Sequence, residues 1–172
     1  EQMNKLLKNT VNVVQSAKFD ISFTMLEVGA VSLSESPERF YELLDYFPDS
    51  KIIGFELDED VCHEMNSKAR KGIQYFPYAL GESNETRQLY ITNHPMCTSL
   101  YKPNEKLLSL YKNMEVAYLK TETSVETVSL DHFVKSNNLG KIDFIKIDVQ
   151  GAELDIFKGG TKTLSDVLKI VC

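Results

Sequence analysis

Apolar segments alternate with segments of helical periodicity along most of the chain, and this alternation limits the folds it can adopt. Five apolar segments have the length and composition of buried strands: residues 21–29, 51–57, 73–80, 142–148 and 167–172. Helical spacing or helix-capping residues mark the segments between them: residues 36–47, 58–72, 130–140 and 152–160. Such alternation is typical of a parallel sheet with helices on both faces. We therefore predict a three-layer, Rossmann-like α/β domain with a mostly parallel sheet.

The middle of the chain interrupts this alternation. Two extended segments, residues 87–92 and 123–130, flank a long polar stretch from Asn93 to Glu122, in which residues 105–112 have helical character. Connections of this length are usually functional or mobile. We predict that residues 93–122 form a lid or insert loop within a single domain that spans residues 1–172.

Charge and cysteine content disfavour several classes of protein. A net charge of −6 argues against a nucleic-acid partner held through its phosphates. The three cysteines, Cys62, Cys97 and Cys172, have no paired spacing, which favours a reducing, cytoplasmic compartment. No apolar run reaches the roughly 18 residues of a membrane span. Because the chain starts at Glu1 and ends in a strand-like segment, we expect trimming at both ends, which would remove the last strands of the sheet.

Acidic residues mark the ends of three predicted strands: Glu27, Glu56 and Asp148. Ligands of parallel α/β sheets bind beyond the carboxyl ends of the strands, so these carboxylates are expected at one edge. They suit a ligand with hydroxyls, an amine or a positive charge. The first turn, EVGAVSLSES, contains only Gly29, and it lacks the G-x-G-x-x-G pattern that closes on a pyrophosphate. A nicotinamide-dependent oxidoreductase is therefore disfavoured.

The same strand ends fit S-adenosylmethionine, which carries no phosphate. Gly29 with Ala30 can supply the tight turn near its amino-acid end, and Glu56 can accept hydrogen bonds from both ribose hydroxyls. Small and apolar residues after the third strand can flank adenine, and the acidic edge attracts the sulfonium cation. The cofactor-binding residues predicted here are Glu27, Gly29, Ala30, Glu56, Leu57, Ala79, Leu80 and Asp148.

The segment from Val125 to Gly160 resembles the signature of the FkbM family of S-adenosylmethionine-dependent methyltransferases. The family pattern is a tLD element followed by iDfiKiDvEGaElevlkG. The matching residues are Leu130, Asp131, Asp143, Lys146, Asp148, Gly151, Ala152, Glu153, Leu154 and Gly159. Upstream, EVGA, GFELDED and YALGESNETRQLYIT follow in the family's order, so the resemblance extends from about Thr24 to the end of the chain.

Two further details of the resemblance concern the site. The CTSL segment, Cys97 to Leu100, resembles the family's serine-rich loop, which adds Ser99 to the predicted cofactor site. The first turn departs from the family's D-x-G-A-N-x-G: Glu27, Val31 and Leu33 stand for the aspartate, the asparagine and the second glycine. Later in the chain, Gln150 stands where the family usually has glutamate.

The resemblance implies a class I methyltransferase fold, S-adenosylmethionine as the cofactor, and methyl transfer to a hydroxyl of a sugar, glycolipid or secondary metabolite. Asp148 could then hold the acceptor hydroxyl, take its proton, or contact the amino end of the cofactor. Alternatively, Asp148 caps the following helix. A second hypothesis remains open, because the altered first turn would also fit a non-catalytic, methyltransferase-like binding or scaffold domain.

Glu153 and His94 are the other catalytic candidates. Each has a simpler explanation. The helix dipole stabilises an acid in the first turn of a helix, as for Glu153, and a histidine in a loop, as for His94, is usually exposed without a chemical role. The dipole also accounts for Asp155. Asp148 and Glu153 are oxygen donors without a clear third ligand, so no metal site is predicted.

Overall fold

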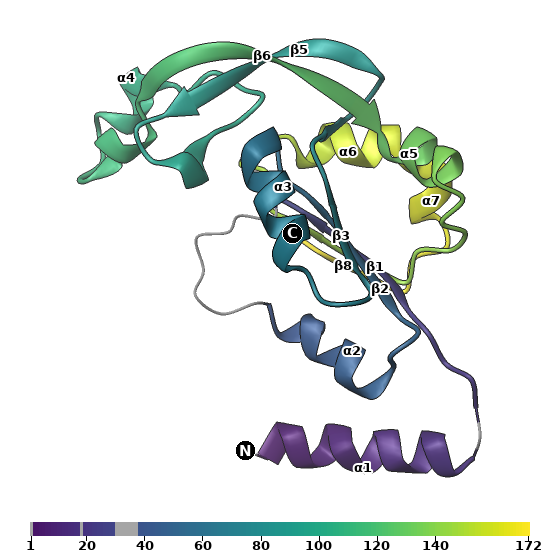
Figure 1. Ribbon diagram of the computed structural model, residues 1–172. Coiled ribbons are helices and arrows are strands. Elements are labelled where there is room, and N and C mark those ends of the chain that lie inside the picture. Colours follow the sequence, from purple (N-terminus) through teal and green to yellow (C-terminus); the bar gives the residue numbers. More distant parts are fainter. Residues whose placement is uncertain (1, 18, 30–37) are drawn as a thin grey trace.

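The computed structural model describes residues 2–17, 19–29 and 38–172 (Figure 1). Within these residues, the centre of the fold is a five-stranded parallel sheet with the order β3-β2-β1-β7-β8. Its strands are β1 (Thr24–Val28), β2 (Lys51–Phe55), β3 (Ile73–Phe76), β7 (Phe144–Ile147) and β8 (Lys169–Val171). The predicted parallel α/β sheet is therefore confirmed.

Helices cover both faces of this sheet (Figure 1). On one side lie the 3₁₀ helix η1 (Arg39–Glu42), α2 (Leu43–Tyr46) and α3 (Glu59–Lys68). On the other side lie α5 (Leu130–Ser136), α6 (Glu153–Gly159) and α7 (Thr161–Leu164). An amino-terminal helix, α1 (Gln2–Ser16), lies beyond α2 on the same side of the sheet. These helices complete the predicted three-layer arrangement, and α1 and α7 are additions that no sequence pattern had predicted.

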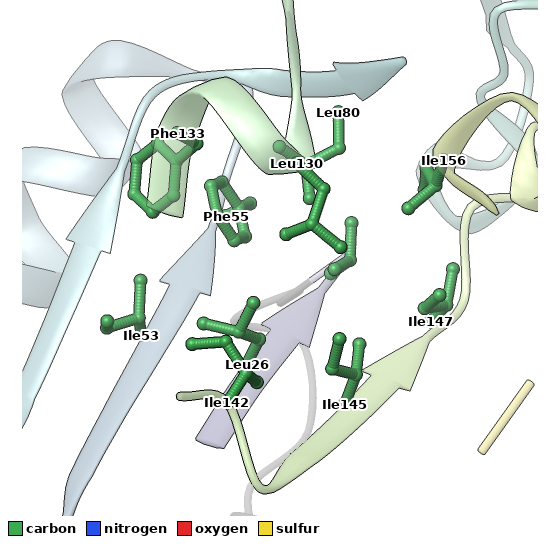
Figure 2. Close-up of a cluster of buried hydrophobic side chains, with 11 residues drawn as sticks. Leu26, Ile53, Phe55, Leu80, Leu130, Phe133, Ile142, Ile145, Ile147 and Ile156 are labelled. Atoms are coloured by element: carbon green, nitrogen blue, oxygen red, sulfur yellow. The ribbon is translucent and has the colours of Figure 1, made fainter. Parts of the chain in front are cut away.

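Side chains alternate along each strand and so divide the core between the two faces. The larger cluster lies between the sheet and helices α5 and α6 (Figure 2). It contains Leu26, Val28, Ile53, Phe55, Leu80, Leu130, Phe133, Ile142, Ile145, Ile147 and Ile156. The cluster on the other face contains Met25, Tyr41, Leu44 and Ile52. Burial on both faces explains why these strands read as continuous apolar runs in the sequence.

A second, three-stranded sheet with the order β4-β6-β5 lies beyond the carboxyl ends of the first in the described structure. Its strands are β4 (Ala79–Gly81), β5 (Glu85–Thr92) and β6 (Leu119–Ser129). The prediction of one strand over residues 73–80 was therefore wrong. Pro77 has no N–H group for a strand ladder, and the chain leaves the main sheet there to pair β4 with β6.

Other predicted elements are present with different limits. The helix predicted over residues 58–72 ends at Lys68, because Ala69 is extended and Gly72 has a φ of +91°. The helix predicted over residues 36–47 is described as η1 and α2, and its predicted start lies outside the described residues.

The polar stretch from Asn93 to Glu122 is largely structured. It contains η2 (Pro95–Cys97), α4 (Glu105–Leu108), η3 (Met114–Ala117) and the first residues of β6. The helical piece predicted over residues 105–112 is therefore shorter than expected. Asn104 caps it, since its side chain accepts a hydrogen bond from the N–H of Leu107.

Asp131, in the first turn of α5, fastens α7 to the rest of the fold. Its carboxylate accepts hydrogen bonds from the N–H of Lys162 at 3.1 Å and from the N–H and hydroxyl of Thr163 at 2.8 and 2.7 Å. Burial favours the neutral carboxyl, but these bonds outweigh it and lower the pKa of Asp131. Asp131 thus acts as a helix cap supplied by a distant segment.

We expect Asp131→Ala to lower the free energy of unfolding by about 1–2 kcal/mol, because the first N–H groups of α7 lose their acceptor. Urea denaturation followed by circular dichroism would measure this loss. Asp131→Asn is the matched control, and it should lose less because the amide keeps one acceptor oxygen. An unchanged denaturation midpoint for Asp131→Ala would contradict the capping role.

Candidate functional site

The strand register brings three strand ends to the same height. Val28, the last residue of β1, pairs with Phe55 of β2 on one side and with Ile147 of β7 on the other. The residues that follow each strand are Gly29, Glu56 and Asp148. They therefore lie next to one another at the carboxyl edge of the sheet, where ligands of such folds bind.

A cavity of about 410 Å³ lies at this edge. Its wall combines the strand ends with a roof formed by β5, β6 and residues 95–100. Seven of the predicted site residues line it: Gly29, Glu56, Leu57, Ala79, Leu80, Ser99 and Asp148. Three others, Glu27, Glu153 and His94, do not, and Ala30 lies outside the described residues.

Three acids and no basic side chain line the cavity within the described part of the chain. The acids are Glu56, Asp58 and Asp148, and most of the remaining wall is apolar. Burial raises the pKa of Glu56, although the N–H of Asp58, which donates to Glu56 Oε1 at 3.0 Å, opposes this shift. A pocket with these properties suits a ligand that combines apolar surface with hydroxyls or a positive charge.

Asp148 faces this cavity and does not cap the following helix. The N-cap of α6 is Ala152, which has no side-chain cap, so the alternative explanation for Asp148 does not apply. Instead, Gln150 Nε2 donates a hydrogen bond to Asp148 Oδ1 at 2.8 Å. Both residues line the cavity, so this pair belongs to the candidate site.

Glu27 was expected at the same edge, but it points to the opposite face of the sheet. There its Oε2 accepts a hydrogen bond from the Tyr41 hydroxyl at 2.6 Å, and its Oε1 lies 3.5 Å from Lys146 Nζ. Burial raises the pKa of Glu27, although Tyr41 and Lys146 oppose this shift. Strand alternation explains the difference, because Glu27 shares a face with Met25 rather than with Val28.

Glu153 and His94 also lie away from the cavity wall. Glu153 Oε1 accepts a long hydrogen bond of 3.4 Å from the N–H of Val149. His94 is exposed and caps η2, since its Nδ1 accepts from the N–H of Met96 at 3.3 Å. The geometry therefore gives no support to the catalytic roles predicted for these two residues.

The roof is fastened to the sheet edge by Ser99. Its hydroxyl donates to the carbonyl oxygen of Gln150 at 2.8 Å and accepts from the N–H of Tyr101 at 3.0 Å. The backbone of Ser99 also pairs with Tyr90 of β5 in an antiparallel bridge. Ser99, predicted as a cofactor residue, thus holds two parts of the cavity wall together.

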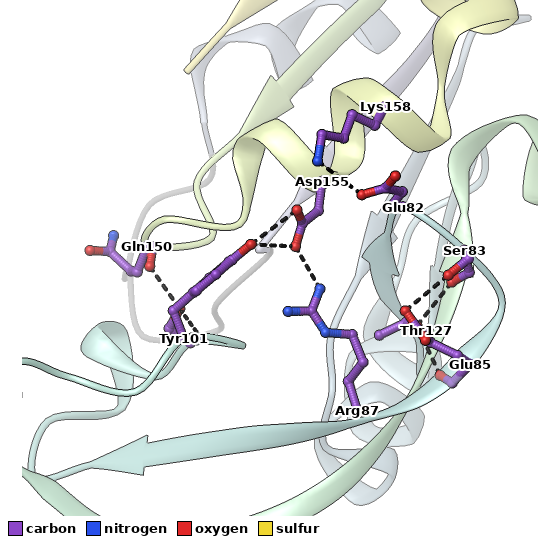
Figure 3. Close-up of polar contacts among 10 residues, drawn as sticks. Glu82, Ser83, Glu85, Arg87, Tyr101, Thr127, Gln150, Asp155 and Lys158 are labelled. Atoms are coloured by element: carbon purple, nitrogen blue, oxygen red, sulfur yellow. Dashed lines mark hydrogen bonds and ion pairs between the residues drawn. The ribbon is translucent and has the colours of Figure 1, made fainter.

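A second fastening joins the roof to α6 through Asp155, which is only 5% exposed. Its carboxylate accepts from the Tyr101 hydroxyl at 2.9 and 3.0 Å and pairs with Arg87 of β5 at 2.5 Å (Figure 3). Burial opposes ionisation, but Arg87 and Tyr101 outweigh it and lower the pKa of Asp155. The helix dipole alone, which was the sequence-based explanation, does not account for this residue.

Several cavity residues were missed in the sequence. Tyr78 lines the wall, but it was assigned to the interior of a single strand over residues 73–80. Leu89 and Ile91 line the roof, and their alternate spacing in QLYIT was the available signal for an apolar face on β5. Met96 and Leu100 come from the polar stretch, in which no periodicity marked them.

The described residues contain neither a cluster of metal ligands nor a membrane-spanning helix. No group of three or more histidine, cysteine, aspartate or glutamate side chains could hold a metal ion. None of the helices that the structure describes is long and apolar enough to cross a bilayer.

Comparison with protein families matches residues 27–171 to the Methyltransferase FkbM domain. This match covers most of the chain and includes every described residue that lines the cavity. No curated protein and no solved structure matches the chain.

Proposed function

The chain belongs to the FkbM methyltransferase domain family, and on this premise we propose that it transfers a methyl group from S-adenosylmethionine to a hydroxyl oxygen of a sugar, glycolipid or secondary metabolite. The observation that carries this proposal is the acidic cavity at the carboxyl edge of the sheet. Its only charged lining residues in the described structure are Glu56, Asp58 and Asp148. S-adenosylmethionine has a net positive charge and no phosphate, so such a wall attracts it.

The residues present fit this donor along the whole cavity. Glu56 would accept hydrogen bonds from the ribose hydroxyls, and Tyr78 with Leu80 would flank adenine. Gly29 and Asp148 would hold the amino-acid end. A volume of about 410 Å³ lies within the usual range of small-molecule pockets. When bound, S-adenosylmethionine supplies an electrophilic methyl group.

Within this proposal, Asp148 also serves the acceptor. A hydroxyl must lose a proton during methyl transfer, and a carboxylate within hydrogen-bond reach can take it. Gln150 donates to Asp148 Oδ1, and the described residues leave Oδ2 available to a ligand. Residues 93–122 act as the lid, and five residues of this stretch already line the cavity: Pro95, Met96, Thr98, Ser99 and Leu100.

The free thiols Cys62, Cys97 and Cys172 support a reducing, cytoplasmic setting for this reaction.

The acidic wall of the cavity repels phosphorylated and carboxylated compounds. We therefore expect the methyl acceptor to be a neutral compound that carries a hydroxyl, and a screen of such compounds would identify it.

We expect the protein to bind S-adenosylmethionine and S-adenosylhomocysteine with micromolar affinity, and Glu56→Ala to weaken both by at least about tenfold. This is the effect of losing hydrogen bonds to a charged acceptor. Isothermal titration calorimetry measures it. Glu59→Ala is the matched control: Glu59 is exposed, lies three residues along the chain and does not line the cavity.

Each result of this titration decides a separate point. Wild-type binding by Glu56→Ala would remove Glu56 from the donor site. No binding of either compound by folded wild-type protein would reject the methyltransferase proposal and favour a non-catalytic binding or scaffold domain.

A further inference from the structure

We propose that residues 101–120, within the lid, form a docking surface for an anionic lipid bilayer. The surface consists of exposed apolar side chains on α4, on the turn after it and on η3, together with the lysines beside them. Figure 1 shows α4 at the outer end of the arm formed by β5 and β6, away from the main sheet. The inference goes beyond the proposed methyl transfer, because it concerns a partner and not the reaction.

Four large apolar side chains are exposed to solvent in this segment. Leu110 and Tyr111 are 77% and 61% exposed, and Leu107 and Val116 are exposed as well. The chain is compact here, since the N–H groups of Leu110 and Tyr111 donate to the carbonyl oxygens of Leu107 and Leu108. Helix α4 packs against η3, which brings Val116 close to this group. Exposed apolar side chains that gather in this way mark a surface for a partner or a membrane.

The charge of this segment is opposite in sign to that of the whole chain. Residues 101–120 contain four lysines and only two glutamates, whereas the net charge of the chain is −6. Lys102 pairs with Glu122 at 3.0 Å, but the other three lysines form no ion pair with any residue that the structure describes. They are Lys106, Lys112 and Lys120. Charges more than about 8 Å away are largely screened at physiological salt, so the local excess of lysine decides what this surface attracts.

A bilayer with anionic lipids matches both properties. Leucine and tyrosine side chains enter the boundary between headgroups and acyl chains, and neighbouring lysines contact the anionic headgroups. A second copy of this chain matches less well. In a twofold dimer the same surface would face itself and bring its unpaired lysines together, which like-charge repulsion opposes.

The docking surface adjoins the wall of the cavity. Met96 of η2 lines the cavity and is 50% exposed, and the N–H of His94 donates to the carbonyl oxygen of Val116 at 2.8 Å. A bilayer bound at residues 101–120 would therefore lie beside the lid. Among the proposed acceptors, this position favours a glycolipid held in the bilayer. That consequence rests on the proposed function, whereas the docking itself does not.

We expect the whole protein to float in a density gradient with vesicles of phosphatidylcholine that contain about 30% phosphatidylserine, and to bind phosphatidylcholine vesicles at least about tenfold more weakly. The double variant Leu110→Ser/Tyr111→Ser should bind both kinds of vesicle at least about tenfold more weakly, because both depend on apolar burial. The double variant Lys106→Gln/Lys112→Gln should lose about tenfold on the anionic vesicles alone.

Two changes elsewhere on the surface are the matched controls. Leu168 is 68% exposed just before β8, and Lys135 is exposed on α5. Leu168→Ser and Lys135→Gln should therefore bind vesicles like the wild type. Thermal unfolding of each variant establishes that it is folded.

Three results would overturn the docking surface. The first is a folded wild-type protein that floats with neither kind of vesicle, and the second is wild-type flotation by both double variants. The third is a wild-type dimer in analytical ultracentrifugation that Leu110→Ser/Tyr111→Ser dissociates, which would assign the surface to a second copy of the chain.

The flotation assay contains no S-adenosylmethionine, so it is independent of the donor. A protein that floats with anionic vesicles but binds no S-adenosylmethionine would keep the docking surface and lose the proposed function. A protein that binds S-adenosylmethionine but floats with no vesicles would keep the proposed function and lose the docking surface.

Discussion

Replacement of Asp155 by alanine should lower the free energy of unfolding by about 3 kcal/mol, because it breaks a buried ion pair. The substitution removes the partner of Arg87 and of the Tyr101 hydroxyl together. The Arg87 side chain is only 22% exposed, so water compensates its charge incompletely. We therefore expect a loss of stability near the lower end of the range measured for broken buried ion pairs.

A nearby ion pair provides the control. Lys158 of α6 and Glu82 lie 3.0 Å apart, but their side chains are 50% and 53% exposed. Glu82→Ala should therefore cost less than about 1 kcal/mol. Chemical denaturation of both variants measures the contrast. Equal losses for the buried and the exposed pair would show that Asp155 does not fasten the roof.

The effect of Asp155 should also depend on pH. Its pKa is lowered in the folded protein, so its contribution is complete above the ordinary aspartate pKa of about 3.9. That contribution is lost as pH falls through the lower, folded value. The difference in stability between wild type and Asp155→Ala should therefore be constant near neutral pH and shrink below about pH 4.

Gly29→Ala should both destabilise the fold by more than about 2 kcal/mol and abolish donor binding. Gly29 has a φ of +83°, which strains any residue with a Cβ atom. A Cβ at this position would lie 2.1 Å from the carbonyl oxygen of Asp148, which is main chain and cannot rotate away. The alanine must push β1 and β7 apart just where Asp148 faces the cavity.

Gly140→Ala is the control for Gly29→Ala, because it introduces backbone strain without a steric clash. Gly140 also has a positive φ, +72°, but nothing lies within 4 Å of its added Cβ. It should lose only about 1 kcal/mol and keep donor binding. Denaturation and calorimetric titration of the two variants give both readouts. If Gly29→Ala lost no more stability than Gly140→Ala and still bound donor, Gly29 would not pack tightly against Asp148.

Much of the fold could be predicted from local patterns. The apolar runs that became β1, β2 and β7 are buried on both faces, and this burial alone produces their composition. The strand-end rule then brought Glu56 and Asp148 to one edge without any knowledge of contacts. The parallel register explains this proximity, because strands that end at the same height place the residues that follow them next to one another.

The errors have a common cause in pairing between distant segments. Nothing within residues 73–80 shows that β4 will pair with β6, whose partner residues begin at Thr127. The direction of Glu27 depends on which face of β1 meets η1, because Tyr41 of η1 donates a hydrogen bond to the Glu27 carboxylate. The role of Asp155 depends on Arg87 and Tyr101, which lie far away in the sequence.

The sequence by itself thus determined the layered α/β class, the parallel strands and the acidic edge, because periodicity and strand-end chemistry are local properties. Only the tertiary structure decided which acids enter the cavity, what forms its roof and what holds that roof in place. Those outcomes depend on strand register and on side chains from remote segments, and neither can be predicted from a local sequence pattern.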